Sequence, residues 1–285
     1  MTTAAARPAD RTMLMVSTTA TMLVLVCAWV LAQLLFLGGL SAQRAQAVLY
    51  DDLRAQLASA TAPLGPVVPV GDPVALLTIP GLGVEQVVVE GTASGDLLSG
   101  PGHQRNTVLP GQTGTSVVMG RAATYGRPFA DLAALGTGDT ITTVTAQGRT
   151  DFEVIGVRRA GDPLPQPRPE GAARLVLVTA EGQGRLSALA PGEVVYVDAE
   201  ADEAHPAPAG LPSAIPDPEQ AMGTEPAALP LLVLCLGLLL ALTLGVIAAR
   251  QRWSMALVWV VATPVVVATA WVTTDVVMRS LPNLL

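Results

Sequence analysis

Three long runs of apolar residues stand out along the chain, one near its start and two near its end. They extend for 32, 21 and 22 residues without a charged side chain. A helix needs about 20 apolar residues to cross the hydrocarbon core of a bilayer. The pattern therefore predicts three transmembrane helices, at 13–40, 229–249 and 254–274. The first run could also be a cleaved signal peptide, but its apolar core is about twice the usual length, which favours an uncleaved anchor.

Arginine placement predicts the orientation of these helices. Arg7 and Arg11 precede the first run, and Arg250 and Arg252 lie in the short turn between the other two. Positively charged flanks stay in the cytoplasm. We therefore expect a multi-pass protein of the cell membrane with a cytoplasmic N-terminus. This orientation places residues 1–12 and 250–253 in the cytoplasm, and residues 41–228 and an external tail at 275–285 outside the cell.

The outward-facing part begins and ends with segments that lack a strand pattern. Leu49, Leu53 and Leu57 recur every four residues, which predicts one apolar stripe along a helix. Proline is frequent both after this helix and shortly before the second apolar run. The expected organisation is a juxtamembrane helix at 41–60, a linker at 61–73, a folded domain at 74–200 and a flexible Pro-rich tether at 201–228.

The segment 74–200 has a different character from its neighbours. Short runs rich in Val, Ile and Thr alternate with Gly and Pro, a spacing typical of an all-β sandwich or barrel. About 130 residues are enough for one hydrophobic core. The runs predicted to be strands are 74–80, 84–91, 115–120, 139–145, 150–157, 174–180 and 192–199.

Composition narrows the chemistry that this domain could perform. The net charge of −7 argues against nucleic acid as a partner, because no basic surface is available for phosphates. Cys27 and Cys235 both lie inside predicted transmembrane helices, so the outward-facing part has neither a disulfide nor a thiol nucleophile. His103 and His205 are about 100 residues apart and do not have the spacing of a zinc site. We therefore expect neither a metal nor another cofactor.

A series of short motifs carries a resemblance to a known family. In order, the motifs are Leu77-Thr78-Ile79-Pro80, Glu90-Gly91-Thr92, Gly100-Pro101-Gly102-His103, Leu109-Pro110-Gly111-Gln112-Thr113-Gly114, Val117-Val118-Met119-Gly120, Thr124-Tyr125-Gly126-Arg127-Pro128-Phe129 and Leu135-Gly136-Thr137-Gly138-Asp139-Thr140-Ile141. Over about residues 75–199 the series resembles the sortases, most of all the class E-like sortases of actinobacteria. The resemblance implies an eight-stranded β-barrel at the cell surface. It also implies a cysteine transpeptidase that joins sorting-signal proteins to amines of the cell wall or a pilus.

The chain departs from the family at the positions that carry this chemistry. Arg121 stands where the resemblance implies a catalytic histidine, and Ala180 stands where it implies the nucleophilic cysteine. The position of the family arginine holds Gly192 or Glu193, while Arg185 lies nearby in the sequence. The residues expected to line a vestigial cleft are Arg121, Tyr125, Thr179, Ala180 and Arg185.

These replacements remove what thiol transpeptidation needs. Ala180 has no nucleophile, and the pKa of an arginine is too high for proton exchange near neutral pH. The resemblance therefore predicts a catalytically inactive sortase homologue. Such a barrel could act as a binding or scaffold module for a sorting-signal peptide, a pilin-like protein or an active sortase.

Two other functions stay open from the sequence. The helices could be the working part, packing against partner helices through Gly237, Ala241 and Gly245, with the barrel as a spacer. The barrel could instead be a peptidase or transpeptidase that uses Thr179, although its side chain is expected on the opposite strand face from Ala180. His103 is expected to structure its loop, with a relocated base as the alternative.

Overall fold

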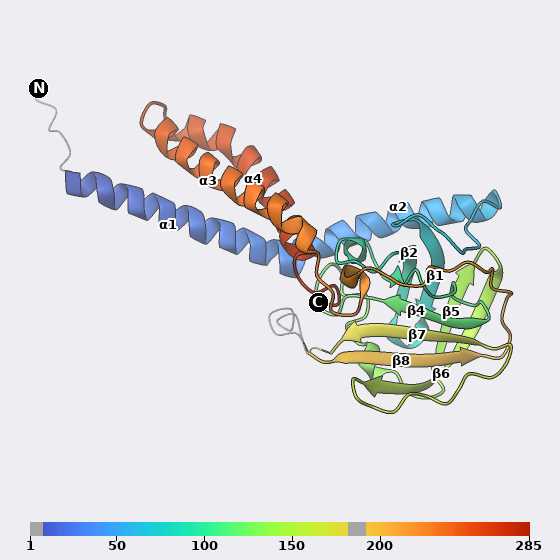
Figure 1. Ribbon diagram of the computed structural model, residues 1–285. Helices are drawn as coiled ribbons and strands as arrows, with labels where there is room; N and C mark the ends of the chain where they lie inside the picture. Colours follow the sequence, from blue (N-terminus) through green and yellow to red (C-terminus); the bar gives the residue numbers. More distant parts are fainter. Residues whose placement is uncertain (1–7, 182–191) are drawn as a thin grey trace, which may run out of the picture. The chain divides into compact units, whose positions relative to one another are not determined.

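The computed structural model describes residues 8–181 and 192–285, and the chain forms two compact units (Figure 1). One unit combines Met1–Leu34 with Ala227–Val277, and the other combines Leu35–Pro226 with Met278–Leu285. The first is helical, and all strands of the described residues belong to the second. The expectation of an all-β protein is therefore correct for the barrel alone, because long helices precede and follow it.

The helical unit contains α1 (Pro8–Ala32), α3 (Leu229–Arg250) and most of α4 (Met255–Arg279). By length and composition, two described segments could cross a membrane, Pro226–Arg250 and Ala256–Arg279. The apolar part of α1 is shorter, at Thr19–Ala32. The two predicted C-terminal spans thus have clear counterparts, whereas the predicted first span is represented by a shorter apolar helix.

The small residues of α3 do not form its packing face within this unit. A Cβ added at Gly237 or Gly245 would meet no described atom within 4 Å, and Ala241 is exposed. The helix packs instead through Cys235, beside Val276, and through Val246. The face with the small residues is therefore left open.

Helix α2 (Gly38–Ala58) is part of the barrel unit and follows a π-helical turn at Gln33–Leu37. Leu53, in the predicted apolar stripe, is fully buried where α2 lies against β1 and β2. The side chain of Gln46 donates to the carbonyl of Val87 at 3.0 Å and accepts from its N–H at 2.7 Å. The predicted juxtamembrane helix therefore packs on the barrel and is not a free stalk.

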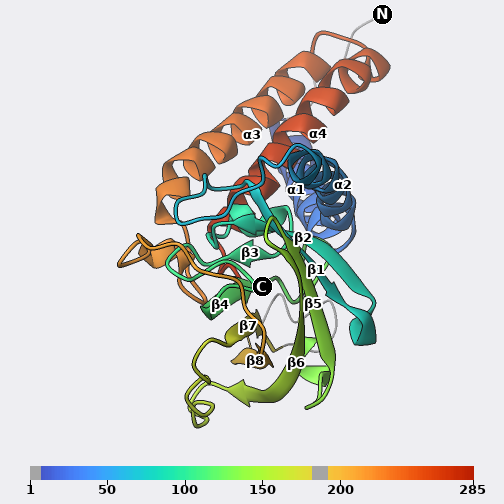
Figure 2. The ribbon, with the colours of Figure 1, turned by 90° about the vertical axis from the view of Figure 1, so that its right-hand side faces the viewer.

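The barrel is closed and has eight strands, as the resemblance implied (Figure 2). Its order around the barrel is β1-β2-β3-β4-β7-β8-β6-β5, with parallel pairing in β2–β3 and β4–β7. Antiparallel pairing joins the other neighbours. The strands are β1 (Pro73–Ile79), β2 (Val84–Glu90), β3 (Gly102–His103), β4 (Gly114–Met119), β5 (Thr140–Thr145), β6 (Gly148–Arg159), β7 (Ala173–Ala180) and β8 (Val194–Ala201).

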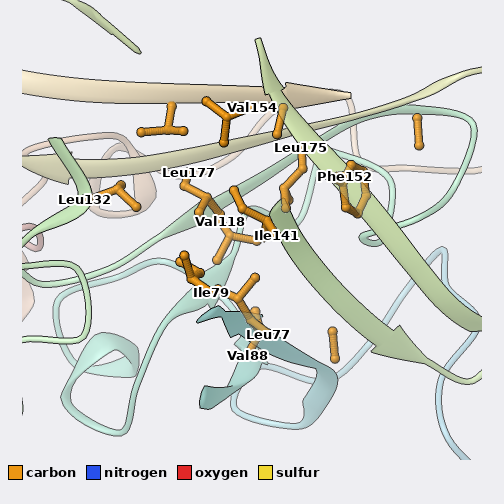
Figure 3. Packing of buried hydrophobic residues seen from close by; sticks show 14 of the residues in the cluster. Leu77, Ile79, Val88, Val118, Leu132, Ile141, Phe152, Val154, Leu175 and Leu177 are labelled. Atoms are coloured by element: carbon orange, nitrogen blue, oxygen red, sulfur yellow. The ribbon is translucent and has the colours of Figure 1, made fainter. Parts of the chain in front are cut away.

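The strands bury their apolar side chains in one interior core. Side chains from β1, β2, β4, β5, β6 and β7 converge there (Figure 3). Leu77, Ile141, Phe152 and Leu177 are essentially inaccessible to solvent. Fully burying one side chain of this size stabilises a fold by about 1.5–3 kcal/mol. This core fixes the ends of β4 and β7, on which the candidate site is built.

The segment 201–228, expected to be a flexible tether, is instead held against the barrel. His205 donates its N–H to the carbonyl of Gly111 and accepts from the N–H of Thr113, both at 2.8 Å. Further on, Glu219 is buried and forms an ion pair with Arg105. After β8 the segment contains only two short 3-10 helices, Asp217–Glu219 and Pro226–Ala228, and these polar contacts fix its path.

Candidate functional site

Arg121 and Ala180, the two positions at which family catalytic residues were expected, lie at the ends of neighbouring strands. Strands β4 and β7 pair in parallel, with Met119 opposite Val178. The pairing continues past β4, because the N–H of Gly120 donates to the Val178 carbonyl at 3.0 Å. Arg121 and Ala180 therefore follow paired residues at the same end of the sheet.

Close packing of the chain fixes the turn after β4. A Cβ at Gly120 would lie only 2.4 Å from Cδ2 of Phe129, whose ring is fully buried. Tyr125 and Arg127 have positive φ values of 48° and 54°, which non-glycine residues rarely adopt. Such strain persists only where the surrounding structure imposes it.

Arg121 is the most deeply buried charged residue of this turn, with 0% of its surface exposed. Its Nη2 donates to the carbonyl of Ser94 at 2.7 Å and to the Ser94 hydroxyl at 2.8 Å. Its Nη1 donates to Thr124 Oγ1 at 3.2 Å and to the carbonyl oxygen of Leu285 at 3.1 Å. Its Nε is buried without a partner among the described residues.

The electrostatic environment of Arg121 follows from this burial. Burial lowers the pKa of the guanidinium to about 10, partly offset by Tyr125 and Glu225. The Tyr125 ring lies 5.8 Å from the guanidinium carbon. A group with this pKa is still protonated at neutral pH. Arg121 can therefore donate hydrogen bonds to carbonyl oxygens but cannot exchange protons as a general base.

Ala180 and Thr179 project from opposite faces of β7. Leu175 and Leu177 point into the barrel core, whereas Val176, Val178 and Ala180 belong to a second apolar cluster. Strand alternation assigns Thr179 to the interior face, and its hydroxyl donates to the Gly120 carbonyl at 2.9 Å. The position of Thr179 agrees with the prediction, and its hydroxyl is used within the fold.

The last residues of the chain cover these strand ends. We call Met278–Leu285 the tail; it belongs to the same compact unit as the barrel. The N–H of Ala122 donates to the carbonyl of Leu284 at 3.0 Å, and Thr124 Oγ1 donates to that of Leu285 at 2.7 Å. Leu284 is fully buried in the second apolar cluster, with Ala180, Ala122, Met119 and Leu97.

Polar contacts hold the rest of the tail. The Asn283 amide donates to the carbonyls of Thr92 and Gln220 at 2.7 and 2.9 Å. The Ser94 hydroxyl donates to the carbonyl of Met278 at 2.7 Å. We call the barrel residues that hold the tail the tail site: Thr92, Ser94, Arg121, Ala122 and Thr124. The views in Figures 1 and 2 both place the C-terminus by β4 and β7.

An open cleft of about 400 Å³ lies next to this turn, between it and helix α2. Tyr125, Gly126 and Pro128 line one side, and Phe36, Leu40 and Gln43 of the helical segment line the other. Tyr125 itself is only 3% exposed. Of the predicted cleft residues, Tyr125 thus borders both Arg121 and an open space.

His103 lies away from the tail and is buried with Glu90. Its Nδ1 is 2.7 Å from Glu90 Oε2, and its Nε2 is 2.9 Å from the carbonyl of Val108. Both ring nitrogens are therefore occupied by groups of the fold itself. This arrangement is that of a residue that structures its loop, which was the expected role.

The remaining predicted positions contribute little to the site. Arg185 lies outside the described residues. Gly192 and Glu193 precede β8, and the Glu193 carbonyl accepts from the N–H of Glu181 at 2.7 Å. Among residues 8–181 and 192–285, no group of three His, Cys, Asp or Glu side chains is arranged to hold a metal ion.

Sequence reasoning missed the residues that the tail site depends on most. Ser94 and Thr124 have no distinguishing pattern in the sequence, and the tail was expected to be external. The one available signal is that the tail is apolar outside the predicted helix, at Leu281, Leu284 and Leu285. As an arrangement, the site offers donors for peptide carbonyls and an apolar pocket, and both cysteines belong to the other compact unit.

Comparison with known proteins shows what the barrel is similar to. The model of the sortase domain family matches residues 77–185. A sortase D5 transpeptidase of Clostridium perfringens is 20% identical, with a TM-score of 0.46 over 55% of this chain and 98% of that one. Sortase E of Streptomyces avermitilis is 27% identical, with a TM-score of 0.40 over 54% of this chain and 100% of that one.

A further solved structure is C. perfringens sortase C with the C-terminal cell wall sorting motif. It is 18% identical, with a TM-score of 0.41 over 55% of this chain and 88% of that one. No curated protein matches the sequence.

Proposed function

We propose that this chain is a membrane-anchored, catalytically inactive sortase homologue that binds cell-surface ligands without cleaving them; the match of the sortase domain family model to residues 77–185 supports the family. Sortases bind sorting-signal peptides, and they work at the cell surface. The series of motifs favours the class E-like branch. The role is that of a binding or scaffold module in the attachment of surface proteins or pili.

The environment of Arg121 and Ala180 is the observation that carries this proposal. Acyl transfer to a thiol needs a thiolate at the attacking position and a group that titrates near neutral pH beside it. The two strand ends hold a methyl group and a guanidinium that stays protonated. The only cysteines, Cys27 and Cys235, belong to the helical unit.

The alternative nucleophile, Thr179, is poorly placed for chemistry. Its hydroxyl proton is directed to the Gly120 carbonyl, and it is only 2% exposed. Activation of a threonine needs a base that accepts this proton. His103 has both ring nitrogens within hydrogen-bond distance of groups in its own part of the fold, Glu90 and Val108.

The helices support attachment to the membrane with the barrel outside. The α3–α4 hairpin leaves the barrel unit at Pro226 and re-enters it at Met278. Two consecutive spans would return the chain to the side from which it left. With Arg250 and Arg252 in the intervening turn on the cytoplasmic side, the barrel faces outward. An N-terminal anchor with a cytoplasmic end completes this topology.

The test compares the full-length protein with a variant that regains the family residues, Arg121→His, Ala122→Arg and Ala180→Cys. Both proteins, in lipid nanodiscs, are titrated with fluorescent sorting-signal peptides. Anisotropy measures binding, and chromatography measures cleavage, with an active sortase as the positive control. We expect binding without cleavage by the native protein. Cleavage by the native protein would overturn the proposal.

A further inference from the structure

We propose that the tail site is a peptide-binding site whose resident ligand is the chain's own tail, and that Arg121 and the apolar pocket around Leu284 determine what it accepts. The inference deepens the proposed function, because it names the occupant of the same strand ends. The ligand class is a short peptide in a turn conformation, as the tail is at Pro282–Leu285, with an apolar side chain next to a backbone oxygen that Arg121 can bind.

The barrel holds the main chain of the tail, as peptide receptors do. Ala122 binds the Leu284 carbonyl, and Thr124 and Arg121 share the Leu285 carbonyl. Ser94 binds the Met278 carbonyl at the other end of the tail. Four donors from two loops of the barrel thus hold three carbonyls of one short segment.

The side chain of Leu284 anchors the tail in an apolar pocket. Leu284 is 0% exposed, and its cluster includes the small residues Ala122 and Ala180. Leu281, only three residues earlier, is half-buried and lies outside this cluster. A specific anchor would bury Leu284 and leave Leu281 partly exposed. A general apolar contact would bury both leucines.

Arg121 connects the tail to the barrel. One nitrogen binds Ser94 and the other binds Thr124 and Leu285, so the planar guanidinium bridges two loops and the tail. A buried cation is costly unless acceptors surround it. The tail supplies one of these acceptors and, through Leu284 and Leu285, excludes water from the others. A peptide carbonyl is therefore part of the environment that allows an arginine here.

A second segment, residues 219–225, covers the tail. The Asn283 N–H donates to the Gly223 carbonyl at 2.9 Å, and the Glu225 N–H donates to the Arg279 carbonyl at 3.1 Å. Glu225 Oε1 also accepts from the N–H of Gly95 at 2.7 Å. The tail thus lies between the barrel and the segment 219–225. Any other peptide must displace it to reach Arg121.

Hydrogen exchange of the full-length protein in nanodiscs tests the resident ligand. We expect the amides of Leu281, Asn283 and Leu285, which donate to carbonyl oxygens, to be protected, and the protection to be unchanged on dilution of the protein. Leu284→Ala should raise their exchange rate at least about 30-fold, whereas Leu281→Ala serves as a matched control with a much smaller effect. Arg121→Met should raise it about 10- to 100-fold.

A binding experiment tests whether the site recognises a peptide. A chain shortened to end at Ser280 should bind a labelled synthetic peptide of residues 280–285, and the full-length chain should bind it much more weakly, because its own tail competes for the site. A peptide with alanine at position 284 should not bind the shortened chain. Protected amides in β5 and β7 would verify that the shortened chain is folded. If the shortened chain does not fold, the hydrogen-exchange experiment on the full-length protein decides whether the tail occupies the site.

Several results would overturn the inference. They are unprotected tail amides in the native protein, equal effects of the two leucine variants, and equal peptide binding by the full-length and shortened chains. Protection that falls on dilution would indicate a tail supplied by a second copy. None of these readouts depends on catalysis, so cleavage of sorting-signal peptides would refute the proposed function and leave this inference standing.

Discussion

At the scale of single residues, the molecule holds a fully buried guanidinium that donates to oxygen atoms of three other residues. Arg121 binds Ser94, Thr124 and Leu285, and burial lowers its pKa to about 10. Sequence comparison could identify Arg121 as a departure from the sortase pattern. It could not identify the acceptors, because Ser94 and Leu285 are 27 and 164 residues away along the chain.

Gly102 is a residue whose identity is fixed by the backbone around it. A Cβ at this position would lie 2.1 Å from the carbonyl oxygen of Gly91. We expect Gly102→Ala to lower the free energy of unfolding by about 1–3 kcal/mol or more, since the strands would have to separate. Gly156→Ala is the matched control, because nothing lies within 4 Å of its added Cβ. Denaturant unfolding of both proteins would measure the difference, and equal stabilities would contradict it.

Asp96 should make stability depend on pH. Burial, with smaller contributions from Glu219 and Glu225, raises its pKa from 3.8 to about 6. The folded protein therefore holds this proton more tightly than the unfolded chain does, and stability falls as pH rises from about 4 to 6. Above about pH 6, the contribution of Asp96 to the free energy of unfolding no longer changes with pH.

The variant Asp96→Asn cannot ionise but keeps an oxygen for the Ala93 N–H, which lies 3.1 Å from Asp96 Oδ2. Its melting temperature should fall less than that of the native protein between pH 4 and pH 6. The measurement is thermal unfolding at several pH values in the same detergent. Parallel curves for the two proteins would show that Asp96 does not titrate in this window.

At the scale of elements, strand patterns were the most predictable feature. Runs of Val, Ile and Thr indicated seven of the strands, because β-branched residues favour the extended backbone. The strand β3 was missed, since Gly102–His103 is too short to carry a pattern. The contacts of the segment 201–228 and of the tail were also missed, because they depend on partners that are distant in the sequence.

The attachment of α2 to the barrel depends on Gln46. Its amide binds both backbone groups of Val87 and also the Ser99 carbonyl at 2.8 Å. We expect Gln46→Ala to reduce the free energy of unfolding by about 1–3 kcal/mol, because half-buried backbone groups lose their partner. Gln43→Ala, at an exposed position of the same helix, should change it little. Limited proteolysis within 38–58 would show the same ranking, and equal cleavage of both variants would contradict it.

At the scale of the whole molecule, hydropathy predicted the long helices of the helical unit better than it predicted their packing. Both C-terminal spans have the expected length, whereas the stripe of small residues on α3 faces open space. Spacing alone cannot specify which face of an apolar helix meets a neighbour. The barrel itself was predictable through the resemblance, but the seating of the tail was not.

The proposed topology predicts which residues a membrane-impermeant thiol reagent can reach. In cells, Ser213→Cys should react, because it lies in the outward-facing part, and Gln251→Cys should not, because it lies in the cytoplasmic turn. Both positions are exposed in the structure, so burial by protein does not explain a difference. Permeabilised cells provide the control in which both should react. Labelling of Gln251→Cys in intact cells would contradict the topology.

The most direct test of the central claim asks whether the barrel forms an acyl intermediate with any residue. The native full-length protein would be incubated with sorting-signal peptides and hydroxylamine, which captures an acyl group whatever the nucleophile. We predict no hydroxamate above the rate in buffer, because Ala180 and Arg121 provide neither nucleophile nor base. Hydroxamate that increases with protein concentration and disappears in Thr179→Val would show that the barrel is an enzyme.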